Sequence, residues 1–481
     1  MSNTTQALSR IEAILDDSSF VEIGARVTAR ATDFNMQEKK APSDGVITGY
    51  GVVNGNLVYV YSQDASVLGG TIGEMHAKKI ASLYEKAMKM GAPVVGLIDC
   101  AGLRLQEATD ALNGFGEIYK NMSLASGIIP QITAVYGECG GGLAVLAELS
   151  DFVFVEEKKA KLFVNSPNAL DGNYESKLDT SSAKFMAEAG VVDFVGDEET
   201  IANGVRQLVS MLPSNNAEGT VCTDNQDDLN RVCQDMEAEI ADPALALTDI
   251  SDDGVFVETK AEYAKEMVTG FILVDGVTVG AVANRTALYD ENGEKAEEFA
   301  PVLTTAGAYK AAEFVTFCNA FEIPVLTLTN VKGFEATVKS ERTIAKAAAK
   351  LVYAFSNADV PKVNIITGEA YGSAYVAMNS KSIGADMVYA WTQASIGMMD
   401  ASLAAKIMYA DDIAASKDVT STINEKAAEY AALQSSVDQA AARGYVDTII
   451  NPEDTRKYVA AAFEMLFDKR EVRADKKHGT V

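Results

Sequence analysis

The stretch ITAVYGECGGGLAV, residues 132–145, contains the pattern on which the whole chain is built. An apolar run typical of a buried strand stops at Gly137-Glu138, and three glycines (140–142) precede the next apolar run. Glycine weakens regular elements, so three together indicate backbone that comes unusually close to something else. The pattern predicts a strand that ends in a tight turn and leads into a helix.

The same plan returns in VNIITGEAYGSAYV, residues 363–376. Landmark residues of the two regions lie 231 positions apart: Pro93 and Pro324, Pro130 and Pro361, Gly137 and Gly368. Upstream, Asn54-Gly55 and Asp275-Gly276 each separate two apolar runs, which is a strong hairpin signal. Their spacing is only 221, so the second copy carries about ten extra residues, visible as LYDENGEKAEEFAP, 288–301. The order and spacing indicate an internal duplication.

Strands alternate with amphipathic helices in each copy. Apolar residues recur at helical spacing from Ile72 to Met88, ahead of an expected strand at 93–99. Residues 341–358 are expected to form the corresponding helix before a strand at 363–368. This alternation predicts an α/β fold with mostly parallel strands. A polar, acidic stretch at 213–243 places the boundary near 235, giving domains 1–235 and 236–481.

The composition of the chain argues against several classes of function. A net charge of −27 over 481 residues argues against nucleic-acid binding, which needs concentrated Lys and Arg. No apolar run is long enough to span a bilayer, and the N-terminus lacks the pattern of a secretory signal. Five cysteines, with no C-x-x-C pair, fit a reducing compartment and give no zinc motif. A cytoplasmic enzyme without a bound metal is expected.

A glycine turn between a parallel strand and a helix presents free N–H groups at the positive helix end. Phosphate binding is disfavoured because no Lys-Ser or Lys-Thr follows Gly142. Two readings stay open: an oxyanion hole that stabilises negative charge on a carbonyl oxygen, or glycine needed only for tight helix–sheet packing. The repetition of the turn favours the first.

Seven segments carry a family likeness: RIEAILDDSSFVE (10–22), DGVITGYGVVNGNLVYVYSQD (44–64), GGTIGEMHAKKI (69–80), ASGIIPQITAVYGECGGG (125–142), VPKVNIITGEAYGSAYVAMNSKSIGAD (360–386), ARGYVDTIINPEDTRK (442–457) and KREVRADKKHG (469–479). In this order they resemble the carboxyltransferase subunits of biotin-dependent acyl-CoA carboxylases and decarboxylases, of the propionyl-CoA carboxylase beta and methylmalonyl-CoA decarboxylase alpha kind. The resemblance implies two tandem crotonase-like (ClpP/crotonase) domains. It also implies transfer of carboxylate between biotin on a carrier protein and the α-carbon of a short acyl-CoA.

That chemistry gives the repeated turn a purpose. Carboxyl transfer generates two oxyanions, the ureido oxygen of biotin and the thioester enolate, so two sets of backbone donors are needed. The resemblance implies that the first half binds the CoA ester and the second half binds biotin. Residues implied in catalysis are Gly102, Gly141 and Gly142 in the first half and Gly333, Ser373 and Ala374 in the second. Residues implied in ligand binding are Gly69, Gly70, Arg104, Gly372 and Tyr375.

The resemblance further implies partners: a biotin carboxyl carrier protein, with either a biotin carboxylase or a membrane sodium-pump decarboxylase subunit. In the latter case the enzyme would be peripheral to a membrane complex. A homodimer or a trimer of dimers is the implied assembly, with the active site between the N-half of one protomer and the C-half of another. The direction of the reaction and the identity of the acyl group are left open by the residues.

This sequence departs from the family pattern at three loops. DCAGLRLQEA (99–108) replaces D-S-G-G-A-R-x-Q-E-G, and residues 165–190 lack the usual Gly-Gly-Ala and His. VKGFEATVKSE (331–341) lacks both prolines of P-G-F-x-P-G. Gly-Gly-Ala becomes Gly372-Ser373-Ala374, which keeps a backbone donor only if Ser373 has a negative φ.

Two other functions remain as alternatives. A crotonase-type hydratase or isomerase would use carboxylate bases, for which Glu138 and Glu369 are candidates because each follows a strand-ending glycine. A scaffold subunit that has lost a site is the non-enzymatic alternative.

Three individual residues also have competing explanations. His76 is expected to be a buried structural histidine rather than a CoA contact. Arg104 fits either a transferred carboxylate or a salt bridge with Glu107. Lys89, in AMKM, resembles a biotinylated lysine but continues a helical pattern.

Overall fold

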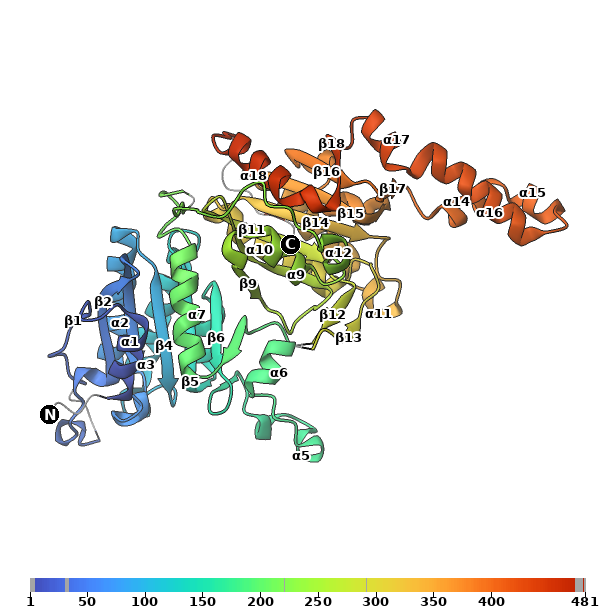
Figure 1. The fold of residues 1–481 in the computed structure, drawn as a ribbon. Coiled ribbons are helices and arrows are strands. Elements are labelled where there is room, and N and C mark those ends of the chain that lie inside the picture. Colours follow the sequence, from blue (N-terminus) through green and yellow to red (C-terminus); the bar gives the residue numbers. More distant parts are fainter. Residues whose placement is uncertain (1–4, 31–33, 220, 291, 472–478, 480–481) are drawn as a thin grey trace. The chain divides into compact units, whose positions relative to one another are not determined.

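The computed structural model describes residues 5–30, 34–219, 221–290, 292–471 and 479. The chain divides into two compact units: unit 1 comprises residues 1–219 and 260–263, and unit 2 comprises residues 220–259 and 264–481. Each unit is built around a twisted sheet covered by helices, as the ribbon in Figure 1 shows. The expected α/β architecture of two tandem crotonase-like domains is confirmed.

Unit 1 contains an eight-stranded sheet in the order β1-β2-β3-β4-β5-β6-β8, with β7 paired to β5. The first three strands pair antiparallel and the later ones pair parallel. The strands are β1 (Val21–Ile23), β2 (Val46–Val53), β3 (Asn56–Gln63), β4 (Val94–Cys100), β5 (Gln131–Gly140), β6 (Phe152–Glu156), β7 (Lys161–Phe163) and β8 (Phe194–Gly196).

Helices cover both faces of the unit 1 sheet. On one face α2 and α3 pack together, and their buried side chains join one core cluster with the strands. On the other face α1 packs against α7 and against strands β2 and β3. The helices are α1 (Gln6–Ile14), α2 (Glu74–Met90), α3 (Ala108–Ala125), α4 (Gly142–Glu148), α5 (Asn173–Ser176), α6 (Ala183–Glu188) and α7 (Glu198–Met211).

Unit 2 repeats this order of elements, and its sheet runs β18-β16-β15-β14-β11-β10-β9, with β17 paired to β15. The strands are β9 (Phe256–Thr259), β10 (Met267–Val274), β11 (Val277–Asn284), β14 (Val325–Val331), β15 (Lys362–Tyr371), β16 (Met387–Trp391), β17 (Ser395–Gly397) and β18 (Thr448–Ile450). The helices that cover it are α8 (Met236–Glu239), α9 (Pro243–Ile250), α10 (Thr305–Ala320), α11 (Val338–Glu341), α12 (Ile344–Asn357), α13 (Gly372–Ala377), α17 (Val437–Ala442) and α18 (Thr455–Leu466).

The two predicted hairpins are confirmed as β2–β3 and β10–β11. The turn residues Asn54 and Gly55 have φ of 48° and 83°, and Asp275 and Gly276 have φ of 52° and 71°. Two successive positive φ values are the mark of a type I′ turn, whose twist matches that of the flanking strands. The Asn-Gly and Asp-Gly pairs therefore fix the register of the β2–β3 and β10–β11 hairpins.

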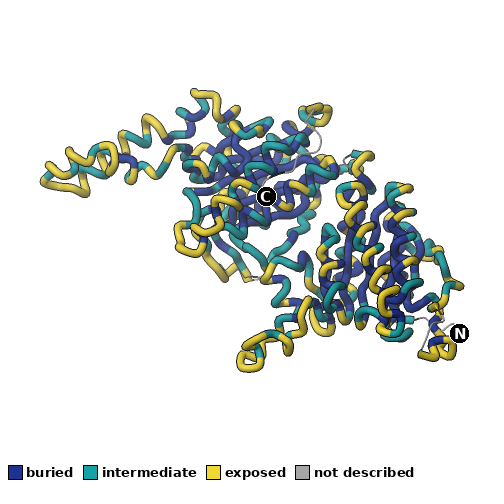
Figure 2. Tube along the Cα trace, turned by 180° about the vertical axis from the view of Figure 1, so that it is seen from behind, coloured by how far each residue is buried: buried dark blue, intermediate teal, exposed yellow. Residues whose placement is uncertain are grey.

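Unit 2 carries two additions to the shared plan. The extra residues of the second copy form a two-stranded hairpin, β12 (Ala287–Tyr289) and β13 (Lys295–Glu298). Between β17 and α17 an arm of three helices projects from the body of unit 2: α14 (Ala401–Met408), α15 (Ala410–Ala415) and α16 (Val419–Tyr430). Exposed residues predominate along this arm (Figure 2).

The boundary lies earlier in the chain than the expected position near 235. The backbone N–H of Thr223 donates to Gly276 O at 2.8 Å, and Cys233 N donates to Glu453 O at 3.0 Å. These bonds attach residues 221–235 to unit 2, although their polar composition resembles a linker. Among the described residues, no helix is both long and apolar enough to cross a membrane.

Candidate functional site

The first glycine turn joins β5 to α4. Gly141 has φ 65° and ψ −126°, a conformation for glycine alone, and a Cβ placed there would meet no atom within 4 Å. Its N–H donates to Phe163 O at 2.8 Å. Gly141 therefore shapes the turn and does not itself offer a donor, which corrects its expected role. The N–H groups of Gly142 and Leu143, at the start of α4, have no acceptor within the helix.

Gly142 is explained by packing. A Cβ at this position would lie 2.5 Å from a ring carbon of Phe115 and 2.8 Å from the hydroxyl of Tyr119. The same Tyr119 hydroxyl donates to Gly142 O at 2.5 Å and fixes the first turn of α4. Packing therefore explains Gly142, and the oxyanion-hole explanation of the glycine run stays a prediction.

Gly102 lies in the loop after β4, next to the first turn, because Cys100 pairs with Cys139 across the two strands. Its φ is 108° and the space around a Cβ would be open. Its carbonyl accepts from Ile72 N at 2.9 Å, and Ala101 N donates to Gly69 O at 3.0 Å. The loop before α2 therefore clamps the loop after β4.

The clamp explains the glycines at 69 and 70. A Cβ on Gly70 would lie 2.4 Å from Asp99 O, and Gly69 and Gly70 have φ of 67° and 64°. Close approach of the two loops requires glycine at position 70, and the positive φ favours glycine at both positions. Nothing in their geometry points to a ligand, so the implied binding role of these two residues stays a prediction.

Arg104 forms the buried salt bridge that was one of its two expected explanations. Its guanidinium is 1 % exposed and donates to Asp44 at 2.6 Å and to Glu107 at 2.8 Å. It also donates to Thr71 O at 2.7 Å. Removing a carboxylate from such a buried pair typically costs about 3–5 kcal/mol, so Arg104 is not available to a substrate. The expected contact with a transferred carboxylate is not supported.

His76 is structural, as expected. Its side chain is fully buried, with Nδ1 3.0 Å from Asp44 O and Nε2 3.2 Å from Gln63 Nε2. Burial lowers the pKa of His76 to about 3. Nearby, burial lowers the pKa of Lys79 to about 8, although its ammonium donates to Ser43 O at 3.1 Å. Sequence reasoning missed Asp44 and Lys79 in this network because no local pattern marks either residue.

The second glycine turn joins β15 to α13. Gly372 has φ 62°, and a Cβ there would lie 3.2 Å from Met398 O. Ser373 is exposed, lies in the first turn of α13 and does not have a positive φ, so the condition for keeping its backbone donor is met. Ala374 is buried at 1 % exposure. Ser373 and Ala374 are predicted for the second oxyanion hole and Gly372 for cofactor binding, and these roles stay predictions.

Tyr375 is half-buried and packs against the small core cluster below the turn. Burial raises the pKa of Tyr375 to about 12. This packing supports α13, and the implied contact of Tyr375 with the cofactor stays a prediction.

The loop at Gly333 repeats the clamp of unit 1. Gly333 O accepts from Leu303 N at 2.9 Å, Lys332 N donates to Pro301 O at 2.7 Å, and a Cβ on Gly333 would meet no atom within 4 Å. Each unit therefore has a glycine after a central strand at which a Cβ would meet no other atom. Each unit also has a positive-φ glycine where the next strand leads into a helix.

Beneath each turn a polar side chain fills the place of a missing Cβ. A Cβ on Gly137 would lie 2.1 Å from Asp99 Oδ1, and one on Gly368 would lie 2.7 Å from Asn330 Oδ1. Asp99 accepts from Arg10 Nη1 at 2.9 Å, and Asn330 accepts from Glu369 N at 3.1 Å. The sequence contained the signal, since Asp99 and Asn330 are themselves 231 residues apart, but neither was predicted to pair with a glycine.

Glu138 and Glu369, the two candidate bases, differ in their ion pairing. Glu138 is exposed, and among the described residues none forms an ion pair with it. Glu369 pairs with Lys332 Nζ at 2.8 Å. Neither glutamate is buried, and nothing in their surroundings favours the hydratase alternative.

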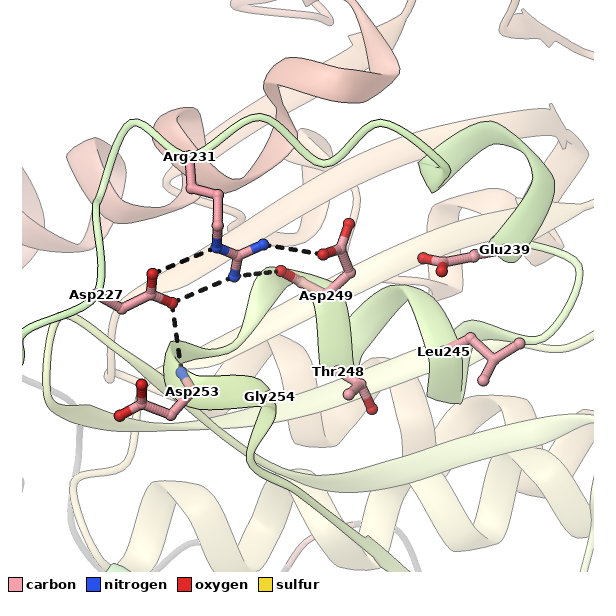
Figure 3. Close-up of a pocket in the computed structure, with 8 residues that line it drawn as sticks. All are labelled: Asp227, Arg231, Glu239, Leu245, Thr248, Asp249, Asp253 and Gly254. Atoms are coloured by element: carbon pink, nitrogen blue, oxygen red, sulfur yellow. Dashed lines mark hydrogen bonds and ion pairs between the residues drawn. The ribbon is translucent and has the colours of Figure 1, made fainter. Parts of the chain in front are cut away.

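A polar hollow of about 480 Å³ in unit 2 was not predicted (Figure 3). Arg231 lies across it, donating to Asp249 at 2.9 Å and pairing with Asp227 at 3.3 Å. No residue of the two turns lines it. Within the described ranges, no group of three or more His, Cys, Asp or Glu side chains is arranged to hold a metal ion.

Comparisons with known proteins agree with this geometry. The carboxyl transferase domain model matches residues 2–481. Methylmalonyl-CoA decarboxylase subunit alpha of Propionigenium modestum is 39 % identical, over 99 % of this chain and 92 % of the relative. Propionyl-CoA carboxylase beta chain of Roseobacter denitrificans is 38 % identical, over 99 % and 93 %.

Among solved structures, the transcarboxylase 12S hexamer with hydrolysed methylmalonyl-coenzyme A bound is similar at 35 % identity and a TM-score of 0.90. The match covers 98 % of this chain and 92 % of the other. Family model, relatives and structure all cover nearly the whole length, including both glycine turns. The chain belongs to the carboxyl transferase family.

Proposed function

We propose that this chain is the carboxyltransferase component of a biotin-dependent acyl-CoA carboxylase or decarboxylase. The observation that carries the proposal is the repeated turn: an open glycine after one strand, and beside it a positive-φ glycine that begins a helix. Each repeat brings backbone N–H groups to the end of a parallel sheet, where ligands of α/β proteins bind. Two such sets suit a reaction that develops negative charge on two substrates.

In unit 1 the donors proposed for the thioester enolate are the N–H groups at the start of α4, at Gly142 and Leu143. Tyr119 holds this turn through its bond to Gly142 O at 2.5 Å. Gly141 sets the direction of the N–H groups through its φ of 65°. A preorganised donor of this kind typically contributes about 10²–10³-fold to the rate.

In unit 2 the residues proposed to hold the ureido group of biotin are Gly333, Ser373 and Ala374. They fit because a Cβ at Gly333 would meet only open space, and the side chain of Ser373 is exposed rather than turned into the core. When bound there, carboxylated biotin would supply the carboxyl group and its freed ureido nitrogen would take up the proton of the α-carbon, so the chain need not provide a base. The chain's own part is to bind, to orient and to stabilise charge with main-chain N–H groups.

The proposed partners are a separate biotin carboxyl carrier protein and either a biotin carboxylase or a membrane decarboxylase subunit. Lys89, the one lysine in a biotinylation-like tetrapeptide, lies in the last turn of α2, which supports biotin arriving on another protein. We also propose a homodimer or a trimer of dimers. The arm of unit 2 supports this with apolar side chains that are 50–62 % exposed: Leu403, Ile407 and Met408.

The test is to incubate the purified protein with malonyl-CoA or methylmalonyl-CoA and free biotin. Biotin-dependent loss of the carboxyl group is the expected result. Hydration of crotonyl-CoA without biotin dependence would overturn the proposal, and absence of both activities in the assembled complex would indicate a scaffold subunit. Light scattering on the same sample would test the proposed oligomer.

A further inference from the structure

The loop after β14 carries a cation that the matching loop of unit 1 lacks. Lys332 directly precedes Gly333, its side chain is 49 % exposed, and its ammonium lies 2.8 Å from Glu369 Oε2. The residues 231 positions earlier are Ala101 and Glu138, so unit 1 keeps the acid and has no lysine there. The lysine is therefore an addition to a loop whose backbone is otherwise repeated.

The backbone that carries this ammonium is fixed in place. Lys332 N donates to Pro301 O at 2.7 Å, and Gly333 O accepts from Leu303 N at 2.9 Å. Glu369 lies in β15, three residues before Gly372, and its own N–H is bound by Asn330 at 3.1 Å. Both members of the ion pair thus stand on ordered backbone between the two loops proposed to hold biotin.

The charges around Lys332 identify the kind of ligand it would take. The groups that act on its ammonium are Glu369, Tyr371 and Asp400, and hydrogen bonding to Glu369 raises the pKa of Lys332. It is thus a cation throughout the neutral range. An ammonium has three donors, so it can keep one bond to Glu369 and offer another to an incoming carboxylate.

The exposure of the side chain decides which basic residue can bind a substrate. Arg104 is 1 % exposed and committed to two buried carboxylates, so it cannot exchange partners. In the Lys332–Glu369 pair the two side chains are 49 % and 35 % exposed, and water can replace either partner at little cost. Of the two, only Lys332 is placed to meet an anion that enters and leaves in each turnover.

We propose that Lys332 binds the carboxyl group that biotin carries, and that Glu369 competes with that carboxylate for the ammonium. The inference rests on the proposed function, and specifically on biotin binding to unit 2. Lys332 acts as a binding residue: it makes and breaks hydrogen bonds, and its proton stays on the nitrogen.

The kinetic test uses carboxylated biotin methyl ester as donor and propionyl-CoA as acceptor. The methyl ester removes the side-chain carboxylate of biotin, and with it a second anionic group that competes for Lys332. Lys332→Ala is expected to raise the KM for the donor at least tenfold, as for loss of a charge-assisted hydrogen bond, and to leave the KM for propionyl-CoA within twofold. The donor KM of Lys332→Arg should stay within threefold of the wild-type value. Glu369→Gln should lower the donor KM.

A second readout does not depend on activity. After reductive methylation with ¹³C-formaldehyde, the Lys332 resonance is followed in the full chain as malonate, a simple dicarboxylate, is added. Malonate should shift this resonance, and the shift should grow in Glu369→Gln. The matched control is Lys295, which forms a 2.8 Å ion pair with Glu298 on the β12–β13 hairpin; its resonance should respond weakly, and Lys295→Ala should leave both KM values unchanged.

The outcomes separate the possible failures. If Lys332→Ala changes both KM values equally, or neither, the inference is wrong while the proposed function stands. If free biotin inhibits more strongly than its methyl ester in the wild type but not in Lys332→Ala, the lysine binds the side-chain carboxylate and the inference is again wrong. If the wild type transfers no carboxyl group, the proposed function itself fails.

Discussion

The two units share a backbone and differ in where they place charge. In unit 1 the side chain under the strand-end glycine is Asp99, paired with Arg10, and the adjacent loop encloses Arg104 between two carboxylates. In unit 2 the corresponding side chain is the neutral Asn330, and the ion pair has moved to the surface as Lys332–Glu369. At these matching loops the main-chain geometry is repeated, while the ion pair is buried in unit 1 and lies at the surface in unit 2.

The largest effect is expected when the buried guanidinium of Arg104 is removed from unit 1. Arg104→Met leaves Asp44 and Glu107 buried without their cation, which should destabilise unit 1 by about 3–5 kcal/mol. Trp391, the chain's one tryptophan, is fully buried in unit 2, so its fluorescence follows unit 2 alone. Urea unfolding should show an early circular-dichroism transition with the Trp391 transition unmoved. A shift of both transitions together would mean that the units do not unfold separately.

The second-largest effect is expected on the kcat, from a change in the glycine turn of unit 1. Gly141→Ala introduces a side chain at φ 65° and ψ −126°, and the peptide is expected to rotate away from that conformation and misdirect the Gly142 N–H. The kcat for carboxyl transfer should fall about 10²–10³-fold, as for loss of one oxyanion donor. Gly116→Ala is the control, since a Cβ there also meets open space and its φ is not positive. Equal losses in both variants would contradict the role of the turn.

The third prediction concerns pH. Because burial lowers the pKa of His76 to about 3, the unfolded chain binds a proton that the folded chain does not, between pH 6.5 and 3. Stability therefore falls as pH drops through this window, by about 1.4 kcal/mol per pH unit, or about 2 kcal/mol between pH 6.5 and 5. The circular-dichroism transition of unit 1 should show this dependence, and His76→Gln should remove it.

A smaller change is expected when unit 1 is made to resemble unit 2. Asp99→Asn keeps a hydrogen-bond acceptor for Arg10 and loses the charge, which should cost about 1 kcal/mol. The unfolding transition of unit 1 by circular dichroism is the measurement. Asn330→Asp, the reciprocal change, gives the comparison in unit 2 through Trp391 fluorescence. A neutral result for Asp99→Asn would mean that the charge of Asp99 is not needed for stability.

The smallest effect on stability belongs to the surface pair. Lys332→Ala should change the stability of unit 2 by less than about 1 kcal/mol, because both side chains are substantially solvated. The Trp391 unfolding midpoint should hardly move. A loss as large as that of Arg104→Met would show that Lys332 is a structural residue and would remove the contrast between the units.

The sequence predicted the elements that local patterns determine. Asn-Gly and Asp-Gly placed both hairpins, and the constant spacing of 231 placed both glycine turns. The Gly102 and Gly333 loops followed from the same spacing. These features depend on residues close in sequence or on repetition, so they can be read without coordinates.

The partners of charged side chains could not be predicted in this way. Arg104 binds Asp44, sixty residues away, because both reach the same buried space once α2 has packed on the sheet. Gly141 looked like a donor, but its N–H is taken by Phe163, a partner chosen by the pairing of β5 and β7. Lys332 and Glu369 meet only because β14 and β15 are neighbours. Tertiary packing decides such contacts.

The serine that follows Gly372 has a broader consequence. At that position the proposed chemistry uses the peptide N–H, which every residue except proline possesses. Substitutions there can alter shape and polarity while leaving the reactive group untouched. An enzyme organised in this way can explore new substrates by ordinary point mutation, and comparison of side chains alone would misjudge which of its descendants are still active.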